Sequence, residues 1–273
     1  MKSCPEHNAA PASLLRRNDA AGVATLTLDD SASRNALSSA MIQTLSEALA
    51  DIARQPGTRA VVIAGEGPAF SSGHDLREMA AHRNDRDKGK EFYERLMGLC
   101  AQMMQAIVQL PKPVIAAVEG VATAAGCQLV AACDLAIAGQ GARFATPGVN
   151  MGLFCSTPLV AIARSVSRKH AMEMAWTGAL YSADEAERFG LINRVVPAGQ
   201  ALTRAQAMAT AMGTSSAKTL AIGKKTFYEQ VELNLNDAYA LASRAMVENL
   251  LLSDAAEGID AFLEKRPPQW ERG

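Results

Sequence analysis

The sequence predicts an α/β fold in which a core of alternating strands and helices is followed by an α-helical C-terminal portion. Short apolar runs alternate with amphipathic segments of helical period up to about residue 155, which is typical of a mostly parallel sheet. Beyond that point helical periodicity dominates. The chain has 273 residues, 49% of them hydrophobic, so a large core can be buried. We see no internal repeat in the sequence.

The order of elements follows from local patterns. Residues 14–17 and 23–28 are two short strands of a hairpin. Ser38 is placed to cap a helix that ends near Arg54, because apolar residues recur on one face of that segment. The next elements are predicted as a strand at 60–64, a helix at 88–110, a strand at 114–118, a helix at 125–132 and a strand at 134–138.

The C-terminal half carries fewer strand signals. Ser182 and Glu185 have the spacing of a capping box that opens a helix, and residues 191–196 are predicted as a lone strand. We therefore expect a flexible N-terminus at 1–12, an α/β core at 13–200 and a helical portion at 201–273.

Composition excludes several classes of partner. The 27 Lys and Arg residues balance 28 Asp and Glu residues, so no basic excess indicates nucleic acid or an anionic membrane. The five cysteines are an odd number without a C-x-x-C pair, which argues against a disulfide framework or a metal site. The first twenty residues lack the apolar segment of a secretory signal. These features predict a soluble protein of the cytoplasm.

Two glycine-containing segments follow predicted buried strands, at 70–76 and 119–128. A turn that leads into a helix leaves backbone N–H groups unpaired, and small residues let the backbone approach a ligand. One such N–H from each turn can hold a single oxygen atom, which is the requirement of an oxyanion hole. The alternative is that each turn serves only packing. Neither segment has the pattern of a dinucleotide-binding or P-loop motif.

Taken together, five segments resemble the crotonase (enoyl-CoA hydratase/isomerase) superfamily over residues 14 to 266. They are RNAL at 34–37, FSSGHDL at 70–76, AAVEGVATAAGCQLVAACDLAIA at 116–138, FATPGVNMGLF at 144–154 and TGALYSADEAERFGLINRVVP at 177–197. The resemblance implies a crotonase-like ββα spiral core and an α-helical C-terminal trimerisation portion. It also implies an acyl-CoA thioester as the ligand and a homotrimer or hexamer, with coenzyme A as part of the substrate and no separate cofactor.

The resemblance implies that two backbone amides, those of His74 and Ala125, hold the thioester oxygen. It further places the two glutamates of the family's hydratases at positions 128 and 148, which are Gln128 and Gly148 in this chain. An amide and a glycine cannot exchange a proton near neutral pH. We therefore expect ordinary hydration of enoyl-CoA to be weak or absent.

Two side chains could supply a different acid or base. Cys155 lies near where some family members place an acid, and the His74 side chain adjoins the expected oxyanion site. The alternative for Cys155 is inert packing, and for His74 a structural hydrogen bond. Asp75 has the position of a helix cap, and Glu119 lies too early in its segment to replace a missing glutamate.

The resemblance also implies groups that contact coenzyme A. Arg34 and Arg77 belong to segments that face its phosphates in the family, and Phe262 and Lys265 match a pair that often contacts the nucleotide. For each cation the alternative is a solvated surface charge. The predicted substrate-binding set is completed by Ser72, Asp75, Leu76 and Gly126.

Three functions remain open at this point. The first is an acyl-CoA enzyme that stabilises a thioester enolate, in a reaction such as isomerisation or cleavage. The second is a true enoyl-CoA hydratase. The third is a catalytically silent protein that binds CoA thioesters or serves assembly.

Overall fold

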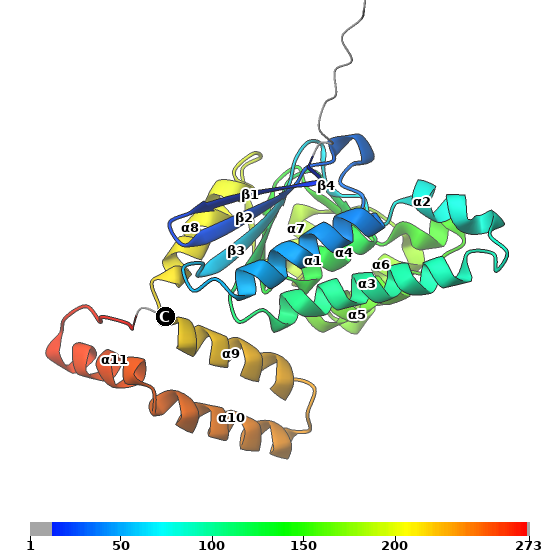
Figure 1. Cartoon of the computed structure of the whole chain (residues 1–273). Helices are drawn as coiled ribbons and strands as arrows, with labels where there is room; N and C mark the ends of the chain where they lie inside the picture. The colour runs from blue at the N-terminus through cyan, green and yellow to red at the C-terminus, as the bar shows by residue number, and fades with distance from the viewer. Residues whose placement is uncertain (1–12, 272–273) are drawn as a thin grey trace, which may run out of the picture.

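The computed structural model describes residues 13–271 of the chain (Figure 1). The segment 1–12, which we expected to be flexible, lies outside the described residues. The described part is a mixed α/β structure, as predicted, with two β-sheets and a C-terminal group of helices.

The larger sheet has six strands in the order β1-β2-β3-β5-β7-β10. Only β1 and β2 pair antiparallel, as a hairpin, and the other neighbours are parallel. The bounds are β1 (Leu15–Ala20), β2 (Val23–Leu28), β3 (Ala60–Gly65), β5 (Val114–Val118), β7 (Leu135–Gly139) and β10 (Arg194–Val196). The predicted strands are all present, although the last is shorter than expected and is the sheet's edge strand.

A smaller sheet has the order β4-β6-β8-β9. Its strands are β4 (Ala69–Ser71), β6 (Val121–Thr123), β8 (Arg143–Ala145) and β9 (Tyr181–Ser182). Each of the pairs β3–β4, β5–β6 and β7–β8 gives one strand to each sheet and is followed by a helix. This structural repeat has no counterpart in the sequence, because two- and three-residue strands are too short for a hydrophobic period.

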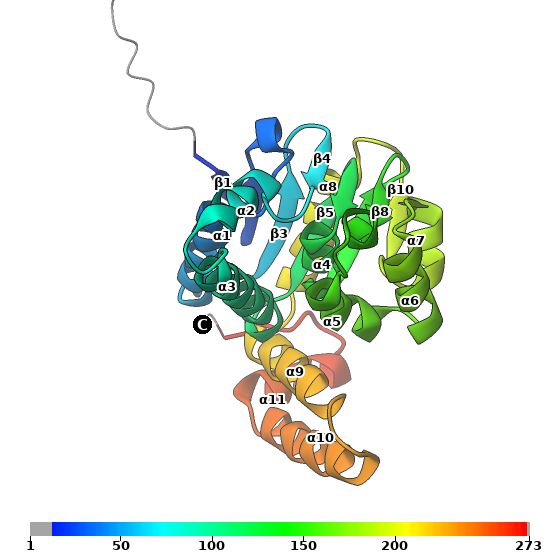
Figure 2. The same cartoon turned by 90° about the vertical axis from the view of Figure 1, so that its right-hand side faces the viewer.

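In the described part of the chain, seven α-helices lie between β2 and β10 in sequence and surround the sheets (Figure 2), and the helix after β10 also packs on the larger sheet. They are α1 (Ser39–Ala53), α2 (Leu76–Ala81), α3 (Lys90–Gln109), α4 (Ala125–Ala132), α5 (Ser156–Ser165), α6 (Arg168–Thr177) and α7 (Ala183–Phe189). The predicted caps are confirmed, since Ser38 Oγ accepts from Met41 N and Ser182 forms a complete capping box with Glu185.

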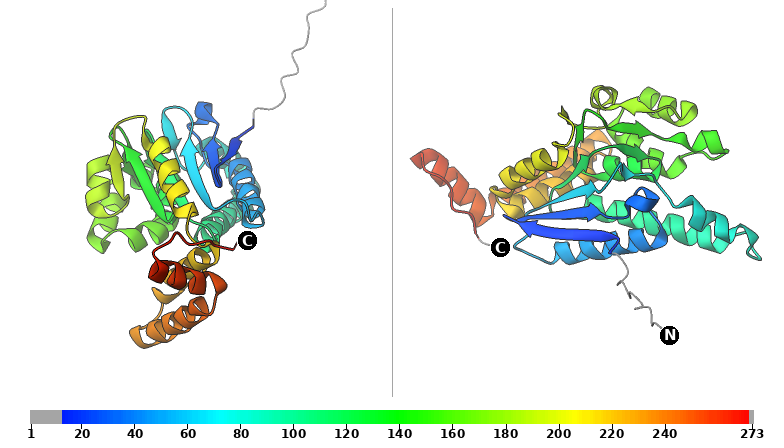
Figure 3. Two further views of the ribbon diagram at one scale, coloured as in Figure 1. Left: turned by 90° about the vertical axis from the view of Figure 1, so that its left-hand side faces the viewer. Right: turned by 90° about the horizontal axis from the view of Figure 1, so that it is seen from above.

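Side chains alternate between the two faces of the larger sheet. Val61 and Ile63 join the main core under α1 and α3, whereas Val62 and Ile115 face α8 (Ala201–Gly213) with its Ala205. Figure 3 shows α8 lying across this second face. The boundary between core and helical portion, which we predicted at residue 200, stays a prediction. Helix α8 comes after this boundary in the chain but packs on the larger sheet.

Three further helices extend away from the α/β body (Figure 1). They are α9 (Ala217–Gln230), α10 (Leu235–Leu250) and α11 (Ser253–Glu264). Within residues 13–271, no helix combines the length and the apolar character needed to cross a membrane.

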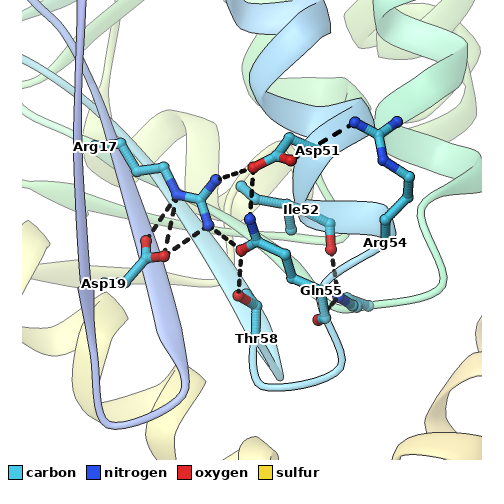
Figure 4. Close-up of polar contacts among 8 residues, drawn as sticks. Arg17, Asp19, Asp51, Ile52, Arg54, Gln55 and Thr58 are labelled. Carbon is cyan, nitrogen blue, oxygen red and sulfur yellow. Dashed lines mark hydrogen bonds and ion pairs between the residues drawn. The ribbon is translucent and has the colours of Figure 1, made fainter.

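A polar cluster ties the hairpin to the end of α1 (Figure 4). Arg17 donates to Asp19 over 2.6 Å and to Asp51 over 2.7 Å, and it also contacts Gln55. Lys112 donates to Ile52 O in the last turn of α1 and to Gln55 O just beyond the helix, the second over 2.5 Å. A cation at this place is favourable, because a helix C-terminus carries partial negative charge.

Candidate functional site

The two glycine-containing segments form equivalent corners of successive ββα units. The first joins β4 to α2 and the second joins β6 to α4. They touch at Gly73, where an added Cβ would lie 2.9 Å from the Cβ of Ala124 and 3.1 Å from the amide nitrogen of Ala125. Tertiary structure therefore brings together the two turns that we predicted to act as one site.

The early RNAL segment holds the first turn in place. Ser72 N donates to Arg34 O over 3.0 Å, Leu37 N donates to Gly73 O over 2.7 Å, and Ser71 Oγ donates to Asn35 O over 2.8 Å. The Ser72 side chain, a predicted substrate contact, donates to the carbonyl of Ser33 over 3.2 Å. The motif thus has a structural role in supporting the turn.

The second turn requires an unusual backbone. Ala124 has φ +50° and ψ −119°, in a region that glycine adopts more readily than alanine. Its amide donates to Ala145 O over 2.9 Å, which fixes the turn against β8. Gly126 is required by close packing, because an added Cβ would lie 2.3 Å from Ser71 O.

The amides of His74 and Ala125 donate no hydrogen bond within residues 13–271. Ala125 is the first residue of α4, where a helix leaves its N–H groups unpaired, and it is 1% exposed. A ligand oxygen could satisfy both donors. This is the local chemistry that an oxyanion hole needs.

Gln128 lies one helical turn after this corner. Its backbone N–H donates to Ala124 O over 3.0 Å. In a helix, the side chain of a residue points back over the preceding turn of the helix. The side chain is 4% exposed, and its Oε1 finds no hydrogen-bond partner in the described part of the chain. The Gln128 side chain therefore leaves a buried oxygen unsatisfied, and a bound molecule could supply its partner.

Gly148, at the second glutamate position, is buried in the 3₁₀ helix 147–151. An added Cβ would lie 2.8 Å from Cys155 Sγ and 3.1 Å from Leu153 O. Cys155, 8% exposed, therefore fills the space that a side chain at 148 would enter. Burial raises the pKa of this thiol, so it is neutral near pH 7.

The His74 ring turns toward the RNAL segment. Its Nδ1 lies 3.1 Å from Leu37 O, so Nδ1 carries the proton and donates it. The other ring nitrogen, Nε2, is shielded from solvent and has no partner within residues 13–271. Burial lowers the pKa of His74, with opposing contributions from the Leu37 bond and Glu78. The ring is thus a neutral, locked imidazole.

Asp75 caps α2, as predicted, because its Oδ1 accepts from Arg77 N over 2.8 Å. Leu76 and Arg77 begin that helix and are exposed. A groove of about 530 Å³ lies beside the two turns. Arg34 and Ser72 line it together with Thr123, Pro147 and Leu180, so one predicted cation adjoins a largely apolar surface.

Phe262 and Lys265 are not brought to these turns within one chain. They lie at the end of α11, which extends away from the α/β body (Figure 3), and Phe262 is 82% exposed. Glu119 has a structural role, since its Oε1 accepts from Ala201 N over 3.0 Å at the start of α8.

Thr146 was not predicted as a site residue. It is fully buried beside Ala145, and its hydroxyl finds no hydrogen-bond partner in the described residues. No local pattern marks it, because only tertiary packing deprives a threonine of both water and a partner. Among residues 13–271, no group of three or more His, Cys, Asp or Glu side chains could hold a metal ion.

Comparison with known proteins gives a consistent result. Residues 18–273 match the family described as "Enoyl-CoA hydratase/isomerase". The chain is 46% identical to rat "Enoyl-CoA hydratase domain-containing protein 3, mitochondrial", over 91% of this chain and 81% of the relative. The "Putative enoyl-CoA hydratase" of Thermus thermophilus is 36% identical, over 91% and 97%.

Solved structures agree in fold. An enoyl-CoA hydratase of Mycobacterium smegmatis is 48% identical with a TM-score of 0.89, covering 94% of this chain and 99% of that one. Human enoyl Coenzyme A hydratase domain-containing protein 3 is 43% identical with a TM-score of 0.89, covering 94% and 100%. The order TPGVNMGLFCSTP after ATAAGCQLVA predicts this same branch, and the comparison confirms the prediction.

One expectation is wrong. Composition and the polar N-terminal segment predict a protein of the cytoplasm. The relatives from rat, mouse, Xenopus, human and zebrafish are instead named mitochondrial. This finding points away from the cytoplasm. Composition could not distinguish the two settings, because proteins in both keep their cysteines reduced and their surfaces polar.

Proposed function

Since this chain belongs to the enoyl-CoA hydratase/isomerase family, we propose that it is an enzyme that binds an acyl-CoA thioester at the two turns. The amides of His74 and Ala125 hold the thioester oxygen and stabilise the enolate. The observation that carries the proposal is that these two amides, on touching turns, have no acceptor within residues 13–271.

The chemistry follows from where negative charge develops. When a bond at the α-carbon of a thioester breaks, its electrons move onto the carbonyl oxygen. Two fixed N–H donors stabilise that oxygen without reorganisation, and removing one such donor costs roughly 3 to 4 kcal/mol of transition-state stabilisation. The Ala125 donor also lies at the positive end of α4.

Ordinary hydration is expected to be weak or absent, because no acid or base replaces the two glutamates. Gln128 has a neutral amide, Gly148 has no side chain, and the Cys155 thiol is neutral. In this proposal Gln128 orients the substrate or a water molecule rather than transferring a proton.

Coenzyme A enters as part of the substrate, and no separate cofactor takes part in this proposal. The groove lined by Arg34 and Ser72 receives the pantetheine arm, with Arg34 and Arg77 near the phosphates. Neither arginine forms an ion pair with a carboxylate within residues 13–271, so both charges are available to a phosphate.

We further propose that the chain forms a homotrimer, or a hexamer of two trimers. The extended helices expose large apolar side chains, of which Leu235, Leu251 and Phe262 are 75%, 81% and 82% exposed. Such a surface is typical of a subunit interface. Phe262 and Lys265 lie away from the turns of their own chain, so their predicted contact with CoA has to cross that interface. Sedimentation velocity tests the oligomeric state.

The second candidate is a silent CoA-binding protein, which the neutral residues at 128 and 148 favour. A screen of acyl-CoA thioesters for turnover, combined with calorimetric binding of a saturated acyl-CoA, distinguishes the two. Binding with turnover supports the enzyme. Binding without turnover of any substrate supports the silent protein.

The test of the oxyanion hole removes one N–H. Ala125→Pro eliminates the amide at the first residue of a helix, a position that proline tolerates. We expect at least a hundredfold loss of turnover with circular dichroism unchanged. Ala183→Pro, at the first residue of α7, is the matched control and should retain activity. Equal activity in both variants would refute the proposed role of Ala125.

A further inference from the structure

Gly148 and Cys155 form a sterically coupled pair. The Cβ that any other residue at 148 must carry would lie 2.8 Å from Cys155 Sγ, closer than real Cβ contacts come. Leu153 O at 3.1 Å closes the same space from the backbone side. Any side chain at position 148 therefore requires the Cys155 sulfur to move and the Leu153 carbonyl to give way.

The sulfur has little freedom to leave. Cys155 precedes the first residue of α5, its own backbone nitrogen is 3.5 Å from the same Cβ position, and its side chain is 8% exposed. Because Sγ is only two bonds from the backbone, either a rotamer change or a movement of the loop is needed to clear the space. Both would disturb packing in a dense core.

Neutral sulfur fills the neighbouring volume as well. Cys127, in the first turn of α4, is fully buried, and burial raises the pKa of its thiol to about 12, with a smaller contribution from Cys155. The Cys127 and Cys155 thiols thus lie in the same region of the core, where α4 packs against α5. A carboxylate introduced here would have to displace a thiol.

We propose that Cys155 is the specificity-determining residue of this site, because it closes the position from which a second acid would reach the acyl chain. The inference rests on the proposed acyl-CoA site and adds a cause for its chemistry: the loss of hydration is fixed by packing and not by the identity of residues 128 and 148 alone. Restoring both glutamates is then insufficient unless the sulfur is also removed.

The packing is tested without any ligand. In a double-mutant cycle, Gly148→Ala should lower the urea midpoint of unfolding, and it should lower the midpoint less in a Cys155→Ala background, where only the Leu153 carbonyl still crowds the added Cβ. Gly141→Ala is the matched control, since nothing lies within 4 Å of its added Cβ. If Gly148→Ala unfolds at the wild-type midpoint, the space is open and the inference is wrong.

The functional consequence is tested with crotonyl-CoA. Gln128→Glu/Gly148→Glu should hydrate it no faster than the wild-type chain, and adding Cys155→Ala should raise the rate at least tenfold. Adding Cys155→Ser, which keeps a γ atom, should not. Equal hydration by the double and triple variants would overturn the inference. Failure of the wild-type chain to bind any acyl-CoA would instead overturn the proposed function, while the unfolding cycle still decides the packing.

Discussion

Lys224 Nζ lies 2.7 Å from Asp134 Oδ2, and this ion pair joins α9 to the start of β7. The two side chains are 9% and 16% exposed. Lys224 also donates to the carbonyls of Ile107 and Lys112, over 2.9 and 3.0 Å, so all three of its protons are used. Asp134 accepts in addition from Tyr228 over 2.9 Å. The extended helices are therefore attached to the core by a fully satisfied buried pair.

Lys224→Met should destabilise the protein strongly, by about 3 kcal/mol, because it leaves a buried carboxylate without its cation. Urea unfolding followed by circular dichroism measures the loss. Lys224→Met/Asp134→Leu should cost less than the sum of the two single changes, since no charge is then left unpaired. Additive losses would contradict this account.

Ala124→Gly should stabilise the protein by about 1 kcal/mol. The strain of an alanine at φ +50° is roughly 1–3 kcal/mol, and the added flexibility of glycine in the unfolded chain offsets part of it. Ala131→Gly, in the last turn of α4, is the control and should destabilise. Thermal unfolding of both variants checks the sign, and a loss of stability in Ala124→Gly would show that its methyl contact with Gly73 dominates.

His74 should make stability depend on pH below its ordinary pKa of about 6.5. Burial lowers its pKa in the folded state, so the unfolded chain binds the proton more readily. The contribution of neutral His74 to the free energy of unfolding is therefore complete above pH 6.5, and it is lost as the pH falls through the pKa of the folded state. His74→Gln should lose less stability than the wild-type chain between pH 7.5 and 5.5. Equal losses in urea titrations would refute the assignment.

Protonation of Glu257 at low pH should detach the C-terminal segment around Arg266 and Gln269 from α11. The two guanidinium N–H groups of Arg266 bind its carboxylate over 2.6 and 2.9 Å, and with the Gln269 amide they lower its pKa to about 2. The attachment is therefore complete above its ordinary pKa of 4.5 and is lost as the pH falls toward 2.

Trp270 reports this release, because its Nε1 donates to Thr214 O over 2.7 Å. In a Trp176→Phe background, its fluorescence should change between pH 4.5 and 2 before circular dichroism does. Glu257→Gln should remove that separate step. A single transition shared by both signals in the parent chain would count against local release.

Sequence alone determined the elements whose patterns are long or chemically marked. The six- and five-residue apolar runs of β3 and β5, and the periodic α1 and α3, are where we predicted them. The residue types in these segments favour one backbone conformation locally. The family motifs additionally predicted which two turns belong to one site. The same motifs identified Gln128 and Gly148 as departures from the hydratase pattern.

Only the tertiary structure decided how distant residues share space. The strands of the smaller sheet are two or three residues long, so they become strands by pairing with segments far apart in sequence. The contact of Gly73 with Ala124 and that of Gly148 with Cys155 depend on such pairing. These packing distances depend on how the whole core is assembled. No local sequence pattern shows which atom from a distant segment will lie in the space beside a glycine.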